Sequence, residues 1–428
     1  MDILLKNAYV ITLDENDDVF ENCCIGIEDK KINYIGRYKE GMDDGYDRVI
    51  DCDGKAVMPG LVNSHTHSSM TLFRNYADDL KLMDWLFKKI FPLEDKLDEE
   101  ESYWGSALAQ LEMIKSGTTA FCDMYFFMDK TAEVCRTSGM RAVLSRGLTG
   151  DDFDYRYKES EELYKKYDGS CDGRIKIILG PHSVYTCSLS YLKKIADKSN
   201  ESGIPLQIHL SETKDEVSNC KKKYGMSPVK LLDSIGALKQ ETIAAHCVAV
   251  DDEDIEILQK RGVNVAHNPG SNLKLASGIA PVAKMEKKGI NVSLGTDGAA
   301  SNNNLDMLEE VRTASYLQKV NEDDPTALPV CDVLKMATVN GAKALGLKDV
   351  GTIESGMNAD LIVLNTKKPY YYPRYNIKSA IVYSGNSSDV DTVIIDGNVV
   401  MENGKVLTLD EERIYYEVER CAKKLTGR

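Results

Sequence analysis

Between residues 56 and 320 the sequence alternates short apolar runs with amphipathic stretches, and this alternation narrows the choice of fold more than any other feature. Parallel strands joined by crossover helices give such a pattern. Eight runs have strand character, at 56–65, 118–124, 141–147, 175–182, 205–210, 242–247, 263–267 and 291–297. Eight strands and their helices within about 265 residues match a (β/α)8 barrel, which typically needs about 250.

The amphipathic segments repeat apolar residues every three or four positions, as helices do. Clear examples lie at 102–117, 190–203, 252–262 and 304–320, and the first ends at Gly117, a common helix stop. An open doubly wound sheet would usually carry a glycine-rich phosphate loop after its first strand, and none follows residue 65. We therefore predict an α/β fold with a TIM-type (β/α)8 barrel.

Both ends of the chain differ from this central region. Residues 2–57 and 351–406 contain short alternating segments, among them 359–365, 379–385 and 391–406, which are typical of small antiparallel sheets. Because the two ends of a barrel lie near each other, these flanks can pair into one small β-sandwich. The expected domains are the N-terminal part of the sandwich at 1–57, the barrel at 58–349, and the rest of the sandwich with a terminal helix at 350–428. Helical segments at 328–347 and 409–425 would complete the barrel and close the chain.

The composition restricts the partners. The chain has 53 Lys and Arg against 68 Asp and Glu, a net charge of −15, so its surface repels phosphate backbones and anionic lipids, and we expect neither a nucleic-acid polymer nor a membrane as partner. No run of 18 apolar residues occurs, and residues 1–14 lack the basic flank and cleavage site of a secretory signal. Eleven cysteines without C-x-x-C spacing fit neither a disulfide framework nor a thiolate zinc site. We expect a cytoplasmic protein.

The chain has only six histidines, and they are not scattered. Five lie at or within one residue of the C-terminal end of a predicted strand, and the sixth follows the first strand by two residues. They are His65, His67, His182, His209, His246 and His267. Catalytic groups collect at this end of a (β/α)8 barrel, whereas the opposite end serves stability. The distribution therefore indicates a functional cluster.

Four of the possible ligands suit one metal ion. His65 and His67 are two residues apart on a strand, so they point the same way and can offer two imidazole nitrogens to one ion. An isolated H-x-H pair can equally be two polar loop residues, but His209 and Asp297 end strands that face and neighbour the first. Three imidazoles and one carboxylate suit Zn²⁺, or Fe²⁺, and leave a position for water, whose pKa the ion would lower to about 7.

Three further residues are candidates for proton transfer or orientation. Glu212 lies three residues after His209, where a partly desolvated carboxyl could carry protons, and this is the favoured interpretation; the alternative is a helix-capping acid, because Ser211-Glu212-Thr213 begins a helix. His246 could orient the water or stabilise the developing oxyanion, or be a buried structural histidine. His267 is open to a structural and a functional interpretation alike.

Several segments carry a resemblance to a known family: VMPGLVNSHTHSSMTLFR, GPHSVYTCS, IHLSET, AHCV, AHNPGSNLKLASGIAP and GTDGAASNNNLDM. They resemble the amidohydrolase superfamily and, within it, the 5-methylthioadenosine/S-adenosylhomocysteine deaminase group, over nearly the whole chain. The resemblance implies one metal ion held by His65, His67, His209 and Asp297. It also implies Glu212 as the proton shuttle and His246 as an aid to the attacking water.

The resemblance also implies substrate contacts. Glu94 matches a residue that binds the nucleoside ribose, although by itself it would be one more acid in an amphipathic helix. The stretch 68–100 is far longer than an ordinary βα connection, and its Trp85, Phe87 and Phe91 among charges are typical of a lid. Trp85 could stack on a purine or cover it.

Two more positions match substrate-binding residues of the family, Arg146 and His182. Arg146 ends the third strand and suits a carboxylate or a ring nitrogen, while Arg156 in the following loop is a weaker candidate. Dinuclear members of the superfamily bridge two metals with a modified lysine at the end of strand four. Here the nearest lysine, Lys176, lies six residues before His182, about 20 Å along an extended strand, which favours a single metal.

We therefore predict hydrolytic deamination of an adenosine-type nucleoside to the inosine-type product and ammonia. Water adds to C6, Glu212 protonates N1, Asp297 accepts a water proton, and His246 stabilises the intermediate. The sequence does not separate 5-methylthioadenosine, S-adenosylhomocysteine, 5-deoxyadenosine and adenosine as substrates. We expect a homo-oligomer, whose number of subunits the sequence does not fix.

Two alternatives remain at this point. A guanine or other aminoheterocycle deaminase, or a triazine-type chlorohydrolase, would use the same metal ligands, and better turnover of a free base than of a nucleoside would favour it. A catalytically inactive scaffold would have lost ligands, and this chain keeps all four.

Overall fold

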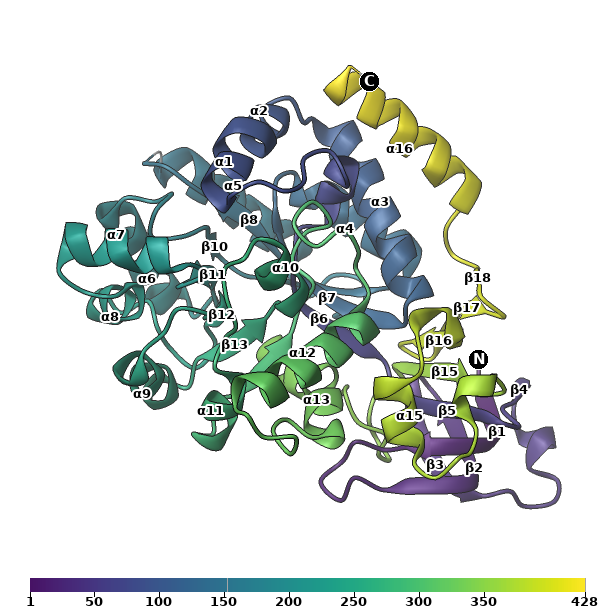
Figure 1. The fold of residues 1–428 in the computed structure, drawn as a ribbon. Coiled ribbons are helices and arrows are strands. Elements are labelled where there is room, and N and C mark those ends of the chain that lie inside the picture. The colour runs from purple at the N-terminus through teal and green to yellow at the C-terminus, as the bar shows by residue number, and fades with distance from the viewer. Residues whose placement is uncertain (152, 428) are drawn as a thin grey trace.

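The computed structural model of the chain describes residues 1–151 and 153–427. Its centre consists of two parallel sheets whose strands follow the chain in order (Figure 1). The first contains β6 (Leu61–Thr66), β7 (Thr118–Tyr125), β8 (Arg141–Leu148), β9 (Ile175–Ile177) and β10 (Gly180–Pro181). The second contains β11 (Gln207–Leu210), β12 (Ile243–His246), β13 (Asn264–His267) and β14 (Val292–Leu294). The predicted α/β class is therefore confirmed.

The two parallel sheets meet at both of their edges. At one edge an isolated parallel bridge joins Leu179 to Leu206, and at the other the backbone N–H of Asp297 donates to the carbonyl of His65 over 2.9 Å. Neither edge is a continuous ladder among the described residues. The central strands are therefore paired as two separate parallel sheets. A closed barrel of eight strands is not present in the strand pairing of the described residues.

Two predicted strands are interrupted. The segment 56–65 divides at Gly60 into β5 (Lys55–Pro59), which pairs with the terminal strands, and β6. A Cβ atom on Gly60 would lie 2.2 Å from the side chain of Thr119, so only glycine allows the chain to pass between the two sheets here. The segment 175–182 likewise divides into β9 and β10.

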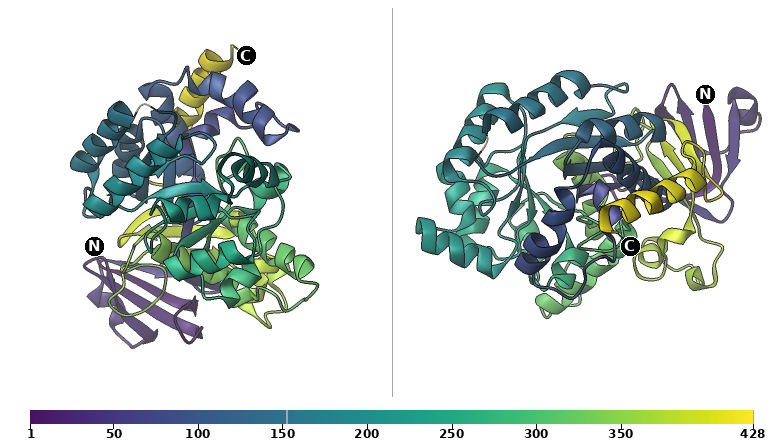
Figure 2. Two further views of the ribbon diagram at one scale, coloured as in Figure 1. Left: turned by 90° about the vertical axis from the view of Figure 1, so that its left-hand side faces the viewer. Right: turned by 90° about the horizontal axis from the view of Figure 1, so that it is seen from above.

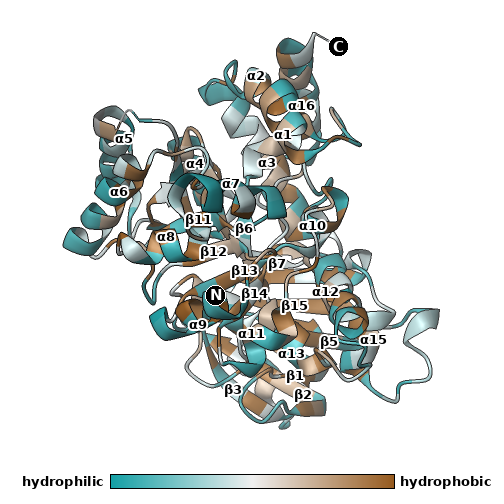
Figure 3. Cartoon of the chain, turned by 60° about the vertical axis from the view of Figure 1, so that its left-hand side comes forward, coloured by the Kyte–Doolittle hydropathy of each residue, from teal (hydrophilic) through white to brown (hydrophobic). Residues whose placement is uncertain are grey.

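Helices follow the central strands and cover them. They are α3 (Glu99–Lys115), α4 (Met128–Ser138), α5 (Phe153–Tyr167), α6 (Leu189–Ser202), α7 (Lys214–Tyr224), α8 (Pro228–Ser234), α9 (Asp252–Arg261), α10 (Pro269–Lys274), α11 (Val282–Lys287), α12 (Met307–Asn321), α13 (Val330–Met336) and α14 (Val339–Ala344). Figure 3 shows hydrophobic residues concentrated on the central strands and hydrophilic ones on the outer helices. The predicted helix at 328–347 is two helices, α13 and α14, which Ala337 and Thr338 separate.

The connection between β6 and α3 contains four short helical segments in place of one loop. They are η2 (Ser68–Phe73), α1 (Leu82–Trp85), η3 (Leu86–Ile90) and α2 (Phe91–Glu94). The segment η3 is a single turn of π-helix, a form that occurs often at functional sites. These elements build the excursion that the sequence predicts as a lid.

Both ends of the chain share one mixed sheet of nine strands, at one side of the molecule (Figure 2). Besides β5 it contains β1 (Ile3–Ile11), β2 (Val19–Glu28), β3 (Lys31–Arg37), β4 (Arg48–Asp51), β15 (Leu361–Asn365), β16 (Val390–Ile395), β17 (Asn398–Glu402) and β18 (Lys405–Val406). Strand β5 joins the two halves, because it pairs in parallel with β1 and antiparallel with β15. Both ends of the chain contribute strands to one sheet, as predicted. Because these strands pair in a single sheet, the predicted two-layered sandwich is not confirmed.

One predicted strand, 379–385, is wrong. The structure has helix α15 (Ile377–Tyr383) there, since the Asn376 side chain accepts the N–H of Ser379 and caps a helix whose Ile381 and Val382 are buried. The terminal helix α16 (Glu411–Thr426) forms as predicted and packs along α3 (Figure 1). No helix in the described part of the chain is long and apolar enough to cross a bilayer.

Candidate active site

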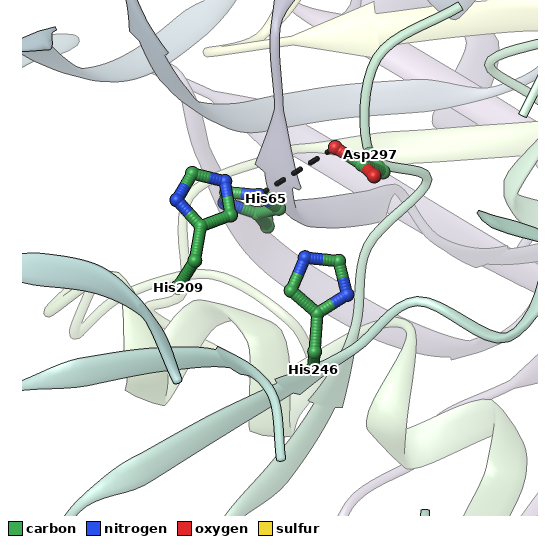
Figure 4. Close-up of side chains that lie close together, drawn as sticks. All are labelled: His65, His209, His246 and Asp297. Atoms are coloured by element: carbon green, nitrogen blue, oxygen red, sulfur yellow. Dashed lines mark ion pairs between the residues drawn. The ribbon is translucent and has the colours of Figure 1, made fainter. Parts of the chain in front are cut away.

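Four elements bring a group of histidines and one aspartate to a single point. His65 is the penultimate residue of β6, His209 lies on β11, His246 ends β12, and Asp297 follows β14 by three residues. One ligand atom from each of these four residues lies within 4.8 Å of the others, and all four side chains are buried. Figure 4 shows the three imidazoles close to the carboxylate of Asp297, which comes from the loop after β14.

His67 belongs to the same cluster. Its Nε2 atom lies 3.2 Å from Nε2 of His209 and 3.2 Å from Oδ1 of Asp297. The structure thus brings together the four predicted ligands and adds His246, so that four imidazoles and one carboxylate share this point.

The hydrogen bonds of this cluster fit a divalent metal ion. Nδ1 of His67 lies 2.6 Å from the carbonyl oxygen of Met124, and Nδ1 of His209 lies 2.8 Å from that of His182. A carbonyl oxygen only accepts, so both Nδ1 atoms donate, and a neutral ring then carries its lone pair on Nε2. These two lone pairs would face each other at 3.2 Å, a repulsive contact that a cation between them removes.

Two further features of the cluster suit a cation. Nε2 of His65 is buried and has no hydrogen-bond partner among the described residues, although it lies 3.7 Å from Oδ1 of Asp297 (Figure 4). Burial lowers the pKa of His65 to about 3, so this ring is neutral at pH 7 and able to act as a ligand. Burial opposes protonation of His67 as well, but its hydrogen bond with Asp297 raises the pKa of His67 to about 9, so a cation bound here would take the place of the proton that His67 shares with Asp297.

The orientation of Asp297 is fixed by its neighbours. Its φ of 62° lies in the left-handed region, and its Oδ2 atom accepts hydrogen bonds from Oγ of Ser271 at 2.6 Å and Oγ of Ser301 at 2.8 Å. Its Oδ1 atom accepts the N–H of Gly298 at 2.9 Å and faces the histidines. One carboxylate oxygen is therefore directed at the cluster while the other is held by hydroxyl groups.

Glu212 lies beside this cluster, in the wall of a cavity. The side chain is buried, with 4% of its surface exposed, and Oγ of Ser277 lies 3.4 Å from its Oε1 atom. Burial raises the pKa of Glu212, which favours the protonated carboxyl. Thr213, and not Glu212, is the N-cap of α7, so the helix-capping interpretation of Glu212 does not hold.

The sequence did not single out Glu216, which lies next to Glu212. Its carboxylate accepts the backbone N–H of Ser211 at 3.0 Å and that of Glu212 at 2.8 Å. Burial raises the pKa of Glu216 to about 8. The only sequence signal is the T-x-x-E spacing from Thr213 to Glu216, which is typical of a helix start.

The predicted lid forms one side of the cavity. Trp85 and Phe91 line it, whereas Phe87 is 48% exposed and does not. Glu94 also lines the cavity and accepts a hydrogen bond from the hydroxyl of Tyr125 at 2.7 Å, and burial raises the pKa of Glu94 to about 7. The sequence missed several lining residues, because they come from unrelated segments: Met70, Leu82, Leu86, Tyr125, Phe126, Tyr185, Leu275 and Ser301.

The remaining candidates differ in position. His182 lines the cavity, and burial lowers its pKa to about 3. Arg146 is not among the lining residues: its Nε donates to Glu159 at 3.1 Å and its guanidinium lies 4.9 Å from the ring of Phe126, which does line the cavity. Arg156 donates to Thr149 of the cavity wall. His267 is fully buried outside the lining.

Known proteins include relatives that match this chain over its whole length. The profile of the Amidohydrolase family matches residues 56–400. The chain is 50% identical over 431 residues to the 5'-deoxyadenosine deaminase of Methanosarcina acetivorans, covering 100% of this chain and 99% of that protein. It is 49% identical over 433 residues to the 5-methylthioadenosine/S-adenosylhomocysteine deaminase of Thermoanaerobacter pseudethanolicus, covering 100% of both.

Among solved structures, an adenosine deaminase from Xanthomonas campestris with bound zinc has the same fold. It superposes with a TM-score of 0.95 at 32% sequence identity, covering 100% of this chain and 99% of that one.

Proposed function

The chain belongs to the amidohydrolase family, and from this premise we propose that it is a metal-dependent hydrolytic deaminase of adenosine-type nucleosides. The observation that carries the proposal is full-length similarity, near 50% identity, to deaminases that act on 5'-deoxyadenosine and on 5-methylthioadenosine or S-adenosylhomocysteine. The convergence of imidazoles and a carboxylate beside a buried glutamic acid supports it.

We assign His65, His67, His209 and Asp297 as the ligands of one divalent ion. Zinc is the first choice, because the Xanthomonas campestris deaminase was solved with zinc, and Fe²⁺ is the alternative. When bound, such an ion lowers the pKa of a coordinated water and so makes a nucleophile available near neutral pH. His246 orients the attacking oxygen. Its Nδ1 atom lies 2.9 Å from Oδ1 of Asn272, and this contact fixes the direction of the imidazole ring.

Glu212 supplies the proton that the purine needs. Burial raises the pKa of Glu212 and so favours the protonated carboxyl, the form that donates to ring N1 as the oxygen bonds to C6. The proton released by the attacking water passes through Asp297 to the amino group. The C6–N bond then breaks, ammonia leaves, and the hydroxyl proton on C6 returns to Glu212, which leaves the inosine-type product. Proton donation at N1 prevents negative charge from building up on the ring, and this lowers the barrier to attack at C6.

The cavity wall offers matching contacts for a nucleoside. We propose that Glu94, held by Tyr125, binds the ribose hydroxyls, that Trp85 covers the purine, and that His182 contacts the substrate. Arg146 lies behind Phe126, where it could contact a substituent on the ribose 5' carbon. We also propose the TIM-type barrel at 58–349, the sandwich of 1–57 with 350–428, and a homo-oligomer.

A substrate panel tests the function. Purified enzyme reconstituted with Zn²⁺ or with Fe²⁺ is assayed for ammonia release from 5'-deoxyadenosine, 5-methylthioadenosine, S-adenosylhomocysteine, adenosine, adenine and guanine. We expect the nucleosides to be deaminated with higher kcat/KM than the free bases. Faster turnover of a free base, or no ammonia from any nucleoside with either metal, would overturn the proposal.

A further inference from the structure

The turn between β11 and α7 decides where the Glu212 carboxyl points. Ser211, the residue before Glu212, has a φ of 50°, in the left-handed region that a serine rarely adopts. Such a conformation persists only where surrounding contacts hold it. Hydrogen bonds from two sides hold this turn.

Glu216 holds the turn from the helix side. Its Oε1 accepts the N–H of Ser211 at 3.0 Å and its Oε2 accepts the N–H of Glu212 at 2.8 Å, so both carboxylate oxygens are used. In an ordinary capping box this glutamate would bond the N–H of the N-cap residue, Thr213. Here Glu216 reaches past Thr213 to the two residues before it, while Thr213 caps the helix by accepting the N–H of Glu216 at 3.1 Å.

The opposite side of the turn is held by the segment after β12. The carbonyl of Ser211 accepts the N–H of Ala249 at 2.8 Å, and the N–H of Cys247 donates to the carbonyl of Leu210 at 3.0 Å. His246 directly precedes Cys247, so the turn with Glu212 and the loop with His246 are tied to each other. All of these residues are buried except Ala249, which is half-buried and takes part through its backbone N–H.

We propose that Glu216 is a positioning residue that sets the orientation of the Glu212 carboxyl for proton transfer, an inference that rests on the proposed deaminase function. Loss of one carboxylate oxygen would leave a buried N–H without an acceptor. The turn would then relax from its left-handed conformation and displace Glu212. Displacements of about 1 Å at a catalytic group can reduce rates about 100-fold.

The variant Glu216→Gln tests this, because glutamine has the same shape but only one acceptor oxygen. We expect kcat for 5'-deoxyadenosine to fall between about 10- and 100-fold, with KM within about threefold of the parent and with unchanged metal content. A merely structural role would lower the amount of folded protein or the Tm but leave the kcat of the folded enzyme unchanged.

A matched control is Asp254→Asn. Asp254 occupies the same position in α9 and is also buried. Its side chain accepts the N–H of Asp251 at 3.3 Å and Oγ of Ser227 at 2.5 Å, and it has no hydrogen bond to Glu212 among the described residues. We expect this change to lower the Tm but to leave kcat within about twofold of the parent.

If Glu216→Gln does not fold, Glu216→Asp serves in its place, because it keeps the carboxyl group on a shorter side chain that cannot reach both N–H groups. Parent-like kcat in the variant that folds would refute the positioning role. Failure of the parent enzyme to deaminate any nucleoside would instead refute the proposed function, so the two results are distinguishable.

Discussion

Replacement of Glu212 by glutamine should abolish turnover while the metal centre stays intact. Glutamine has nearly the same volume and can still form hydrogen bonds, but its amide cannot donate a proton to the purine ring. Glu212 is not one of the five residues whose ligand atoms converge, so the affinity for the ion should not change.

The structure sets the size of the effect. General acid catalysis contributes about 100- to 10,000-fold, or about 2.7 to 5.5 kcal/mol of barrier. Only 4% of the Glu212 surface is exposed, so bulk water has little access to replace the lost acid, and the nearest hydroxyl, on Ser277, is far too weak an acid to do so. We therefore expect a loss of at least about 1,000-fold, in the upper part of that range.

The assay is steady-state ammonia release from 5'-deoxyadenosine, with metal content and Tm measured on the same samples. Glu241→Gln is the matched control, since Glu241 is exposed and lies before β12, at the end of that strand away from His246. We expect parent-like activity for Glu241→Gln. A Glu212→Gln enzyme with parent metal content and a kcat within tenfold of the parent would refute the assignment of Glu212 as proton donor.

Three further predictions follow from the same structure. Trp85→Ala should raise KM for nucleosides about 10-fold or more through lost stacking, and an unchanged KM would show that the indole does not cover the base. Removal of metal with dipicolinate should abolish activity and lower the Tm, and Zn²⁺ should restore both, because an ion at 100 times its Kd stabilises the fold by about 2.7 kcal/mol. Burial raises the pKa of Glu310 from 4.5 to about 8, so its share of stability is present below pH 4.5 and is lost as the pH rises toward 8. Urea unfolding of Glu310→Gln should lack this loss, of up to about 1.4 kcal/mol per pH unit, whereas parallel curves for parent and variant would contradict it.

The local sequence predicted the elements well where one signal acted alone. The runs at 118–124 and 141–147 are β7 and β8, and the histidines do lie at strand ends. One prediction failed where two local signals, strand composition and a helix cap, competed and burial decided between them. The apolar run 379–385 has strand composition, yet the Asn376 cap and burial of one helical face make it α15.

The residues of the candidate site also fall into those that the sequence identified and those that it did not. Histidine placement at strand ends, read with the family resemblance, identified His65, His67, His209 and Asp297 as a group, and the structure brings these four together. No spacing in the sequence could identify Tyr125 as the partner of Glu94, which lies 31 residues away, or direct attention to Glu216.

The sequence by itself determined the alternation of strands and helices and the chemistry of the strand ends, because periodicity and residue type act over a few neighbouring residues. Only the tertiary structure decided which lone pairs face each other, which carboxyl groups are buried deeply enough to stay protonated, and which backbone turn orients Glu212. These properties depend on atoms that are distant along the chain and adjacent in space, so their distances and desolvation exist only once the sheets and their covering helices have packed.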